Sequence, residues 1–373
     1  MSEFKDKIPA ASGKVEYLYD PASKGISTRI SGFARALYIV AVSADGKHLL
    51  STVPAVGLGQ NAVYPRPSVI AFVQSDEQGM WGRNCPSCQK YFRTNHVMDV
   101  TFCPYCSQAN DSLAFCTQDQ RTYITAVYDT FARAYNLKTN TSLDLADVTD
   151  RTPAWHYSEE KQQFHFTCQT ADCGTETDIL GEYGYCPRCG RTNARKLFPE
   201  FVAKELTHLE EVRQTIVDRH KREEVWEKIT VDGLSKFEAL AKHLRRRLLS
   251  FPMTEHRRAQ LEKLNFQKPL AADESLKQWF DIGALQWAGN AGRAERQVIP
   301  SEIPFIKKMV QRRHILIHNG GSVDQEYMDL SGDTQVRLEE RIRIRSNEAK
   351  RFLTLVGEMG MNLLDNVEEG FQC

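Results

Sequence analysis

Arg313, His314 and His318 bring a cation and two imidazoles within six residues of one another near the C-terminal end of the chain. Imidazole titrates near neutral pH and can move protons, whereas a guanidinium keeps its charge and binds anions. If the segment is helical, the two histidines are one turn apart and lie on the same side. The group is therefore either paired within the protein or available to act on an anion.

A helix is expected to carry these residues, from about Pro304, whose fixed φ suits a first turn, to the stop signal Asn319-Gly320-Gly321. Arg313 is predicted at the centre of its apolar arc, Arg312 at the edge and Ile315 opposite the centre. So much apolar surface predicts burial on several sides, inside a bundle or at a dimer interface. The arc consists of Phe305, Ile306, Met309, Val310, Leu316 and Ile317.

Arg313 also has a purely structural interpretation. A guanidinium in an apolar arc can bond to a carboxylate or to helix carbonyls, and the histidines are then ordinary helix-end residues. Asn319, which stands before two glycines, is typical of a helix cap. The residue types alone leave both interpretations open.

The run RHILIHNGG, from Arg313 to Gly321, resembles the active-site motif of HEPN-superfamily ribonucleases, particularly the branch called RiboL-PSP-HEPN. The family pattern is an arginine, a polar residue, a few variable positions and a histidine near the end of a helix in a helical bundle. Arg313, His314 and His318 match that pattern in turn. The gap varies in length, so Arg312 also fits the arginine position.

The resemblance implies a metal-independent endoribonuclease that works as a homodimer, with two copies of the motif facing each other in one cleft. The RNA 2′-hydroxyl is the nucleophile in such an enzyme, and the product ends in a cyclic phosphate. Arg313 would bind the scissile phosphate, His318 would transfer a proton, His314 would assist it, and Asn319 is a weaker candidate. The resemblance further implies an RNA substrate such as tRNA, a toxin or anti-phage defence role, a protein or phage trigger, and no catalytic metal.

Eight of the ten cysteines form two sets with the spacing of zinc ribbons. Each set supplies four thiolates in two knuckles, which is what a tetrahedral Zn²⁺ requires. Two structural zinc ions are expected, and because four-cysteine sites are coordinatively closed, catalysis is expected elsewhere. The sets are Cys85, Cys88, Cys103 and Cys106, and Cys168, Cys173, Cys186 and Cys189.

Two other arrangements of these cysteines stay open, namely two disulfides per set and ligation that interleaves the sets. The N-terminal residues are charged and polar and no apolar signal stretch follows them, which favours reduced thiols and a cytoplasmic location. No apolar run approaches the ~18 residues of a membrane helix, so no membrane partner is expected.

These sites are expected in an α+β multidomain protein that ends in an all-α, HEPN-like bundle. Strands are predicted at residues 37–42 and 68–73. The predicted parts are a β-rich element at 1–80, a zinc ribbon at 81–118, a connector at 119–159, a second zinc ribbon at 160–193 and the HEPN-like helical domain at 194–373.

Helical periodicity dominates from residue 193 onward, and one short helix is predicted in the connector at 123–135. The segment 322–345 is expected to be a loop with a strand-like run at 336–344. The other predicted helices run from 197 to 226, 234 to 249, 256 to 264, 274 to 280 and 347 to 365.

Charge gives weaker information, because the formal net charge is zero and no overall basic field indicates a nucleic-acid partner. Basic residues are nevertheless clustered in the helical part, where together they predict a phosphate-binding surface. The clusters lie at 245–247, 257–258, 307–308 with 312–313, and 341–345.

Three function classes follow from these features. The leading one is the endoribonuclease, and the second is a non-catalytic adaptor whose zinc ribbons bind nucleic acid or protein while the bundle dimerises. The third is a metallohydrolase with His314 and His318 as metal ligands. It lacks an adjacent acidic ligand, since the nearest are Asp324 and Glu326 beyond the two glycines.

Overall fold

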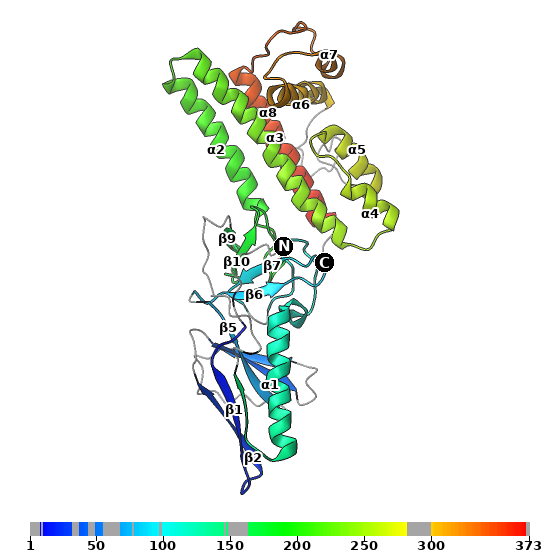
Figure 1. The fold of residues 1–373 in the computed structure, drawn as a ribbon. Helices are drawn as coiled ribbons and strands as arrows, with labels where there is room; N and C mark the ends of the chain where they lie inside the picture. The colour runs from blue at the N-terminus through cyan, green and yellow to red at the C-terminus, as the bar shows by residue number, and fades with distance from the viewer. Residues whose placement is uncertain are drawn as a thin grey trace. The chain divides into compact units, whose positions relative to one another are not determined.

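The protein folds into two units, Met1–Asn193 and Ala194–Cys373, in a computed structural model (Figure 1). The mixed α+β composition predicted from the sequence is confirmed, with strands in the first unit and helices throughout the second. The structure describes residues 8, 10–31, 37–43, 49–54, 68–76, 78–96, 99–144, 147, 163–281 and 300–370.

Three antiparallel sheets form most of the first unit, in the strand orders β2-β1-β8, β4-β3-β5 and β6-β7-β10-β9. The predicted strands at 37–42 and 68–73 are β3 and β5, which pair with each other. The strands are β1 (Lys14–Asp20), β2 (Gly25–Ser31), β3 (Leu37–Ser43), β4 (Leu49–Pro54), β5 (Ser68–Gln74), β6 (Trp81–Asn84), β7 (Tyr91–Thr94), β8 (Thr141–Asp144), β9 (Gln163–Thr167) and β10 (Glu176–Leu180).

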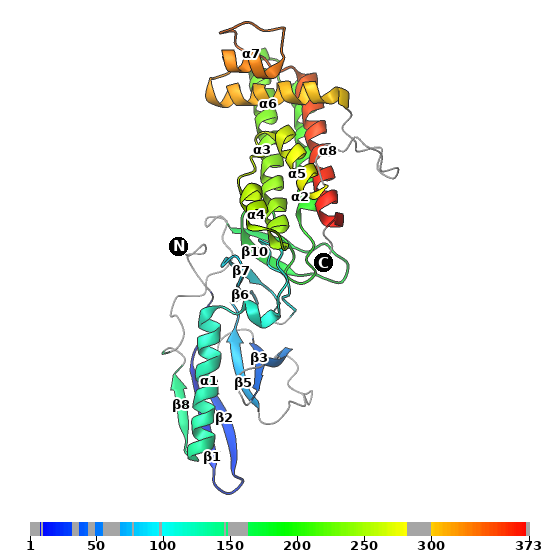
Figure 2. The same cartoon turned by 90° about the vertical axis from the view of Figure 1, so that its right-hand side faces the viewer.

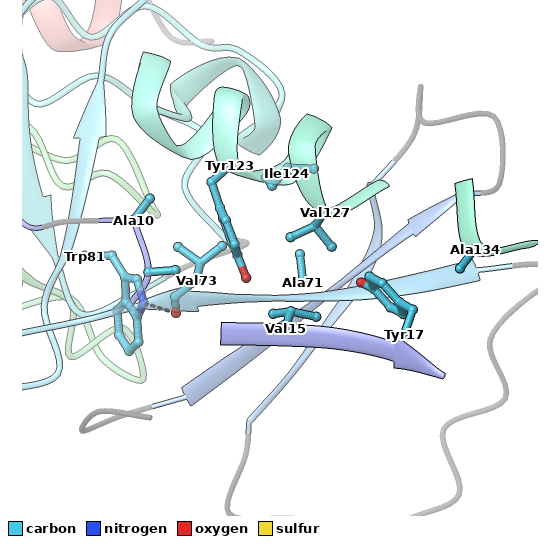
Figure 3. Packing of buried hydrophobic residues seen from close by; sticks show 11 residues of the cluster. Ala10, Val15, Tyr17, Ala71, Val73, Trp81, Tyr123, Ile124, Val127 and Ala134 are labelled. Carbon is cyan, nitrogen blue, oxygen red and sulfur yellow. Dashed lines mark hydrogen bonds between the residues drawn. The ribbon is translucent and has the colours of Figure 1, made fainter. Parts of the chain in front are cut away.

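Helix α1 (Gln118–Leu137) is longer than the helix predicted at 123–135, because Thr117 and Gln120 form a capping box before its first turn. The helix packs on the sheets through Tyr123 and Val127, which lie close to Ala71 and other buried apolar residues (Figure 3). The predicted connector therefore contributes much of the first core, and its β8 completes the sheet of β1 and β2.

The helices of the second unit build a bundle of three long helices with shorter ones beside it (Figure 1). Helix α3 packs against both α2 and α8, and α6 crosses the long helices at a steep angle (Figure 2). The helices are α2 (Ala194–Thr215), α3 (Arg219–Ser250), α4 (Glu255–Glu262), α5 (Pro269–Phe280), α6 (Ile303–His318), α7 (Gln325–Ser331) and α8 (Ser346–Gly370).

Glycines allow the long helices to approach closely. A Cβ atom at Gly360 of α8 would lie 2.1 Å from the Phe198 ring of α2, and one at Gly233 of α3 would lie 3.1 Å from Leu353 of α8. Gly233 also falls between the two helices predicted at 197–226 and 234–249. That prediction was wrong, because α3 is continuous through Gly233, which packing against α8 holds in the helix.

The predicted loop at 322–345 contains helix α7, capped by Asp324, whose side chain accepts a hydrogen bond from the backbone of Tyr327. Its strand-like run makes one isolated bridge, between Ser322 and Arg341. In the part of the chain that the structure describes, no helix is long and apolar enough to cross a membrane.

Candidate metal centres and candidate active site

The first cysteine cluster joins the β6–β7 hairpin to the loop that follows it. The Sγ atoms of Cys85 and Cys106 are 3.8 Å apart, and those of Cys88 and Cys103 are 3.7 Å apart. A tetrahedron with Zn–S bonds of about 2.3 Å has sulfur–sulfur edges of about 3.8 Å. The four thiols therefore have the spacing that one tetrahedral metal ion requires.

The second cluster repeats this arrangement with the β9–β10 hairpin. Cys168 and Cys189 have Sγ atoms 3.5 Å apart, and Cys173 and Cys186 have theirs 3.6 Å apart. The hydroxyl of Thr175 lies 3.2 Å from the Cys173 sulfur. Burial by itself raises the pKa of the Cys173 thiol, but the hydrogen bonds with Thr175 hold that pKa below its usual value.

The geometry decides between the arrangements of cysteines that the sequence left open. Sulfur separations of 3.5–3.8 Å are far longer than a disulfide bond of about 2.05 Å. Within each set all four ligand atoms lie within 4.8 Å of one another. Each sequential set of four therefore forms its own cluster, positioned to bind a metal ion, and the sets are not interleaved.

The knuckles of both clusters end in the left-handed region of backbone conformation. Gln89 and Ser107 have φ of 59°, and the equivalent Gly174 and Gly190 have φ of 56° and 72°. The left-handed residues Gln89 and Ser107 close their turns by donating backbone N–H groups to the carbonyl oxygens of Cys85 and Cys103, both at 2.9 Å. Within the knuckle the backbone N–H of Tyr105 points toward the Cys103 sulfur, with its nitrogen 3.3 Å away. Such N–H donors stabilise thiolate charge.

The two clusters belong to one duplicated module. Strands β7 and β10 pair at the centre of a single sheet, with Thr94 opposite Thr177. The second knuckles also exchange hydrogen bonds, from Phe102 N to Pro187 O at 2.9 Å and from Tyr185 N to Pro104 O at 2.8 Å. The two predicted ribbons are thus joined by both their hairpins and their knuckles.

Helix α6 carries the Arg313 motif and buries a face that overlaps only in part with the predicted one, since Ile306 and Met309 of the predicted arc are buried. Ile315, predicted opposite the apolar arc, is 1 % exposed, and Ile317 of the arc is 44 % exposed. Arg312, predicted at the edge, lies in the buried row with Ile306 and Met309. The prediction failed because apolar residues surround most of this helix, so hydrophobicity alone does not choose the buried side.

Arg312 is fully engaged in the fold. Its Nη2 lies 2.7 Å from an oxygen of Asp333, and its Nη1 lies 3.0 Å from Glu348 of α8. It also donates to the hydroxyl of Tyr327 at 3.3 Å and to the backbone oxygen of Arg343 at 3.4 Å. Burial alone lowers the pKa of Arg312, but the bond to Asp333 raises that pKa above its usual value. Because all these contacts lie within the fold, Arg312 has the structural role first considered for Arg313.

Arg313 is held less tightly, in contact with α3. Its Nη2 donates to the Ser235 hydroxyl at 3.3 Å and lies 3.7 Å from Glu238, which also binds Lys242 at 2.5 Å. Burial lowers the pKa of the Arg313 guanidinium, and the Glu238 charge opposes this shift. Among the described residues the buried Nε of Arg313 has no hydrogen-bond partner. Arg313 therefore retains donor capacity that Arg312 has used.

His314 and His318 lie next to each other on the exposed side of α6, with ring centroids 4.6 Å apart. Asn319 ends the helix, and its backbone N–H donates to Ile315 O at 2.9 Å. The Asn319 side chain donates to Asp324, the cap of α7. The structure thus brings the two imidazoles together, whereas the Asn319 amide stabilises the turn.

Several residues around this site had no sequence signal. Asp333 lies in the predicted loop, where its link to Arg312 across 21 residues leaves no local pattern. Glu238 and Lys242 have the spacing of an ordinary ion pair within one helix, so the sequence gives no sign that Glu238 also lies near Arg313. In the described ranges, groups of three or more potential metal ligands occur only at the two cysteine clusters, so no third ligand joins the histidine pair.

Comparisons with protein-family models, with curated proteins and with solved structures find no match to this chain.

Proposed function

We propose that the protein is a metal-independent endoribonuclease of the HEPN type, with its active site at the end of α6. The observation that carries the proposal is the exposed pair His314–His318, adjacent to an arginine that is held by one hydroxyl and by a carboxylate 3.7 Å away. Imidazoles that contact each other in solvent contribute little to the fold, and they supply the proton transfers that RNA cleavage needs. The resemblance of the motif to HEPN ribonucleases points to the same chemistry.

In the proposed reaction the RNA supplies the nucleophile. One imidazole removes the proton of the 2′-hydroxyl, whose oxygen attacks the adjacent phosphorus, and a protonated imidazole gives its proton to the departing 5′-oxygen. His318 acts in one of these steps, and His314 orients it or shares the proton. Arg313 leaves its single hydroxyl partner, Ser235, and binds the phosphate as negative charge accumulates.

We propose that the active enzyme is a homodimer with a composite cleft. Ile317 is 44 % exposed and lies directly before His318, so a second copy that covers it would bring a second histidine pair to the site. Light scattering is expected to give twice the 42.6 kDa of one chain. A monomeric mass at micromolar concentration would contradict the dimer.

The metal that we propose for the cysteine clusters is zinc, because four thiolates in a tetrahedral arrangement favour it over hard cations. Four protein ligands close the coordination shell, so these ions brace the ribbons and take no part in cleavage. We further propose a cytoplasmic toxin or anti-phage defence role, restrained until a protein or phage trigger binds, on the strength of the motif resemblance alone.

The end groups of the products test the proposed chemistry. An RNA oligonucleotide such as a tRNA anticodon stem–loop is incubated with the protein in excess EDTA, beside the same RNA with one 2′-deoxynucleotide at the cut position. We expect 2′,3′-cyclic phosphate ends and no cutting at the deoxy position. Cleavage that proceeds through a 2′-deoxynucleotide, or stops at once with EDTA and returns with a divalent ion, would contradict it. RNA bound but never cut would favour the adaptor.

A further inference from the structure

Three arginines of the predicted basic clusters stabilise the helical unit itself. Arg245 donates to the backbone oxygens of Glu262 at 2.9 Å and Leu264 at 3.1 Å, at the end of α4. Arg258 donates to Leu249 O at 2.9 Å, near the end of α3. Arg257 likewise donates to Trp279 O at 2.6 Å, near the end of α5. These side chains donate to carbonyl oxygens at helix ends. They are therefore no longer counted in the predicted phosphate-binding surface.

The run from Arg341 to Arg345 is different, because its burial alternates along the chain. Ile342 and Ile344 are 2 % and 1 % exposed, whereas Arg341, Arg343 and Arg345 are all exposed. Alternation with period two is typical of an extended backbone, which places every second side chain on one face, about 7 Å apart. The three guanidiniums therefore form a row, called here the arginine ladder.

The backbone holds the start of the ladder directly against the end of α6. Ile342 N donates to Gly321 O, and Val323 N donates to Glu340 O, both at 2.9 Å. A Cβ atom at Gly321 would lie 3.7 Å from Cγ of Arg341. Gly321 is three residues beyond His318, so the ladder begins beside the proposed catalytic pair.

Arg312 fixes the middle of the ladder, because its Nη1 donates to the backbone oxygen of Arg343. The first guanidinium makes one long ion pair, since Nη2 of Arg341 lies 3.9 Å from Glu227, too far for a hydrogen bond. The Arg341 side chain stays 71 % exposed and accessible to a ligand. The motif helix thus carries the histidines and also holds the segment that carries the ladder.

We propose that Arg341, Arg343 and Arg345 bind consecutive backbone phosphates of a single-stranded RNA whose scissile bond lies at His318. An extended row of guanidiniums has the form of an extended polynucleotide backbone, and each forked side chain can hold one phosphate. The proposal deepens the proposed function and rests on it for the position of the cut. It makes Arg312 a positioning residue for the ladder.

Binding is tested with a fluorescently labelled, fully 2′-O-methylated single-stranded RNA, which lacks the nucleophile and cannot be cut. The variant Arg341→Gln/Arg343→Gln/Arg345→Gln is expected to bind at least about tenfold more weakly, with a salt slope smaller by about 2, since each phosphate contact contributes about 0.7. The triple lysine variant keeps the charge and should bind nearly as the parent does. A matched control, Lys204→Gln/Lys263→Gln/Lys268→Gln, removes three exposed cations outside the predicted basic clusters and should bind within about twofold of the parent.

Three results would contradict RNA binding by the arginine ladder. The ladder variant could bind as tightly as the parent, the control could be weakened as much as the ladder variant, or the matching RNA duplex could bind more tightly than the single strand. Cleavage assays separate this result from the proposed function. If the parent cuts ordinary RNA and the ladder variant cuts it with the same KM, the proposed binding by the arginine ladder is wrong and the proposed ribonuclease activity is supported. If the ladder variant binds RNA more weakly but the parent cuts no RNA, the proposed binding is supported and the proposed activity is wrong.

Discussion

The cysteine clusters and the end of α6 present their reactive side chains in opposite ways. In each cluster four thiols converge within 4.8 Å, and one metal ion would satisfy all of them. At the end of α6, His314 and His318 face solvent beside Arg313. The first arrangement would be completed by an ion inside the fold. The second leaves two imidazoles accessible to a ligand, which is why we propose it as the active site.

The same contrast separates two neighbouring arginines. Arg312 bonds to Asp333 and Glu348, and its departure would leave the buried Asp333 carboxylate without a cation. Arg313 has one hydroxyl partner and one carboxylate at 3.7 Å. Adjacent positions on a helix point about 100° apart, so a single helix can carry one structural and one functional cation side by side.

The largest effect is expected from the clusters. Structural zinc sites of this kind contribute on the order of 10 kcal/mol to folding, so Cys186→Ser should lose one metal equivalent and unfold the ribbon sheet. Mass spectrometry measures the metal content, and hydrogen exchange of β6, β7, β9 and β10 measures the unfolding of the sheet. We expect two zinc ions in the parent and also in the control Cys116→Ser, which lies outside the clusters. Retention of two ions by Cys186→Ser would contradict the assignment.

The next largest effect is expected from substitutions of Arg312 and Arg313, which should differ in how much they lower stability. Arg312→Met leaves the buried Asp333 without its charge partner and removes one of the two cations beside Glu348, so it should lower the free energy of unfolding by about 3–5 kcal/mol. Arg313→Met removes a weaker contact and should lower it by about 1 kcal/mol. Urea denaturation followed by helical circular dichroism measures both variants. Equal destabilisation would remove the distinction between the two side chains.

His243 of α3 provides a pH test of the helical core. Burial, together with Arg246 and Arg247, lowers its pKa to about 3, so the folded state keeps it neutral. The unfolded chain binds the proton near pH 6.5, so stability is lost as the pH falls below that value, by about 2 kcal/mol at pH 5. His243→Gln should remove this loss. The control His208→Gln, at an exposed site, should retain it. An unchanged pH dependence in His243→Gln would contradict the assignment.

The smallest effect is expected at Asn319. Its amide stabilises the turn after α6 through Asp324, so Asn319→Ala should cost about 1 kcal/mol of stability and reduce cleavage less than about tenfold. Thermal unfolding and single-turnover cleavage measure the two quantities. A loss as large as that of His318→Ala would instead place Asn319 in the catalytic machinery.

Local patterns predicted the parts of the molecule that local chemistry determines. The four-cysteine sets and the α6 stop signal at Asn319-Gly320-Gly321 were visible because their residues are close in sequence. The buried side of α6 could not be predicted in this way. Arg312 is buried because it pairs with Asp333 and Glu348, which lie 21 and 36 residues further along the chain. Helix α7 was hidden for a related reason, since its seven residues carry too little periodicity.

An active site at the end of α6 is tested by cleavage of total cellular RNA in excess EDTA, with the parent protein beside Arg313→Ala and His318→Ala. We expect cutting by the parent and a loss of about 10²–10⁴-fold in His318→Ala, with a marked loss in Arg313→Ala and both variants folded. Equal cutting by His318→Ala and the parent would contradict an active site at the end of α6.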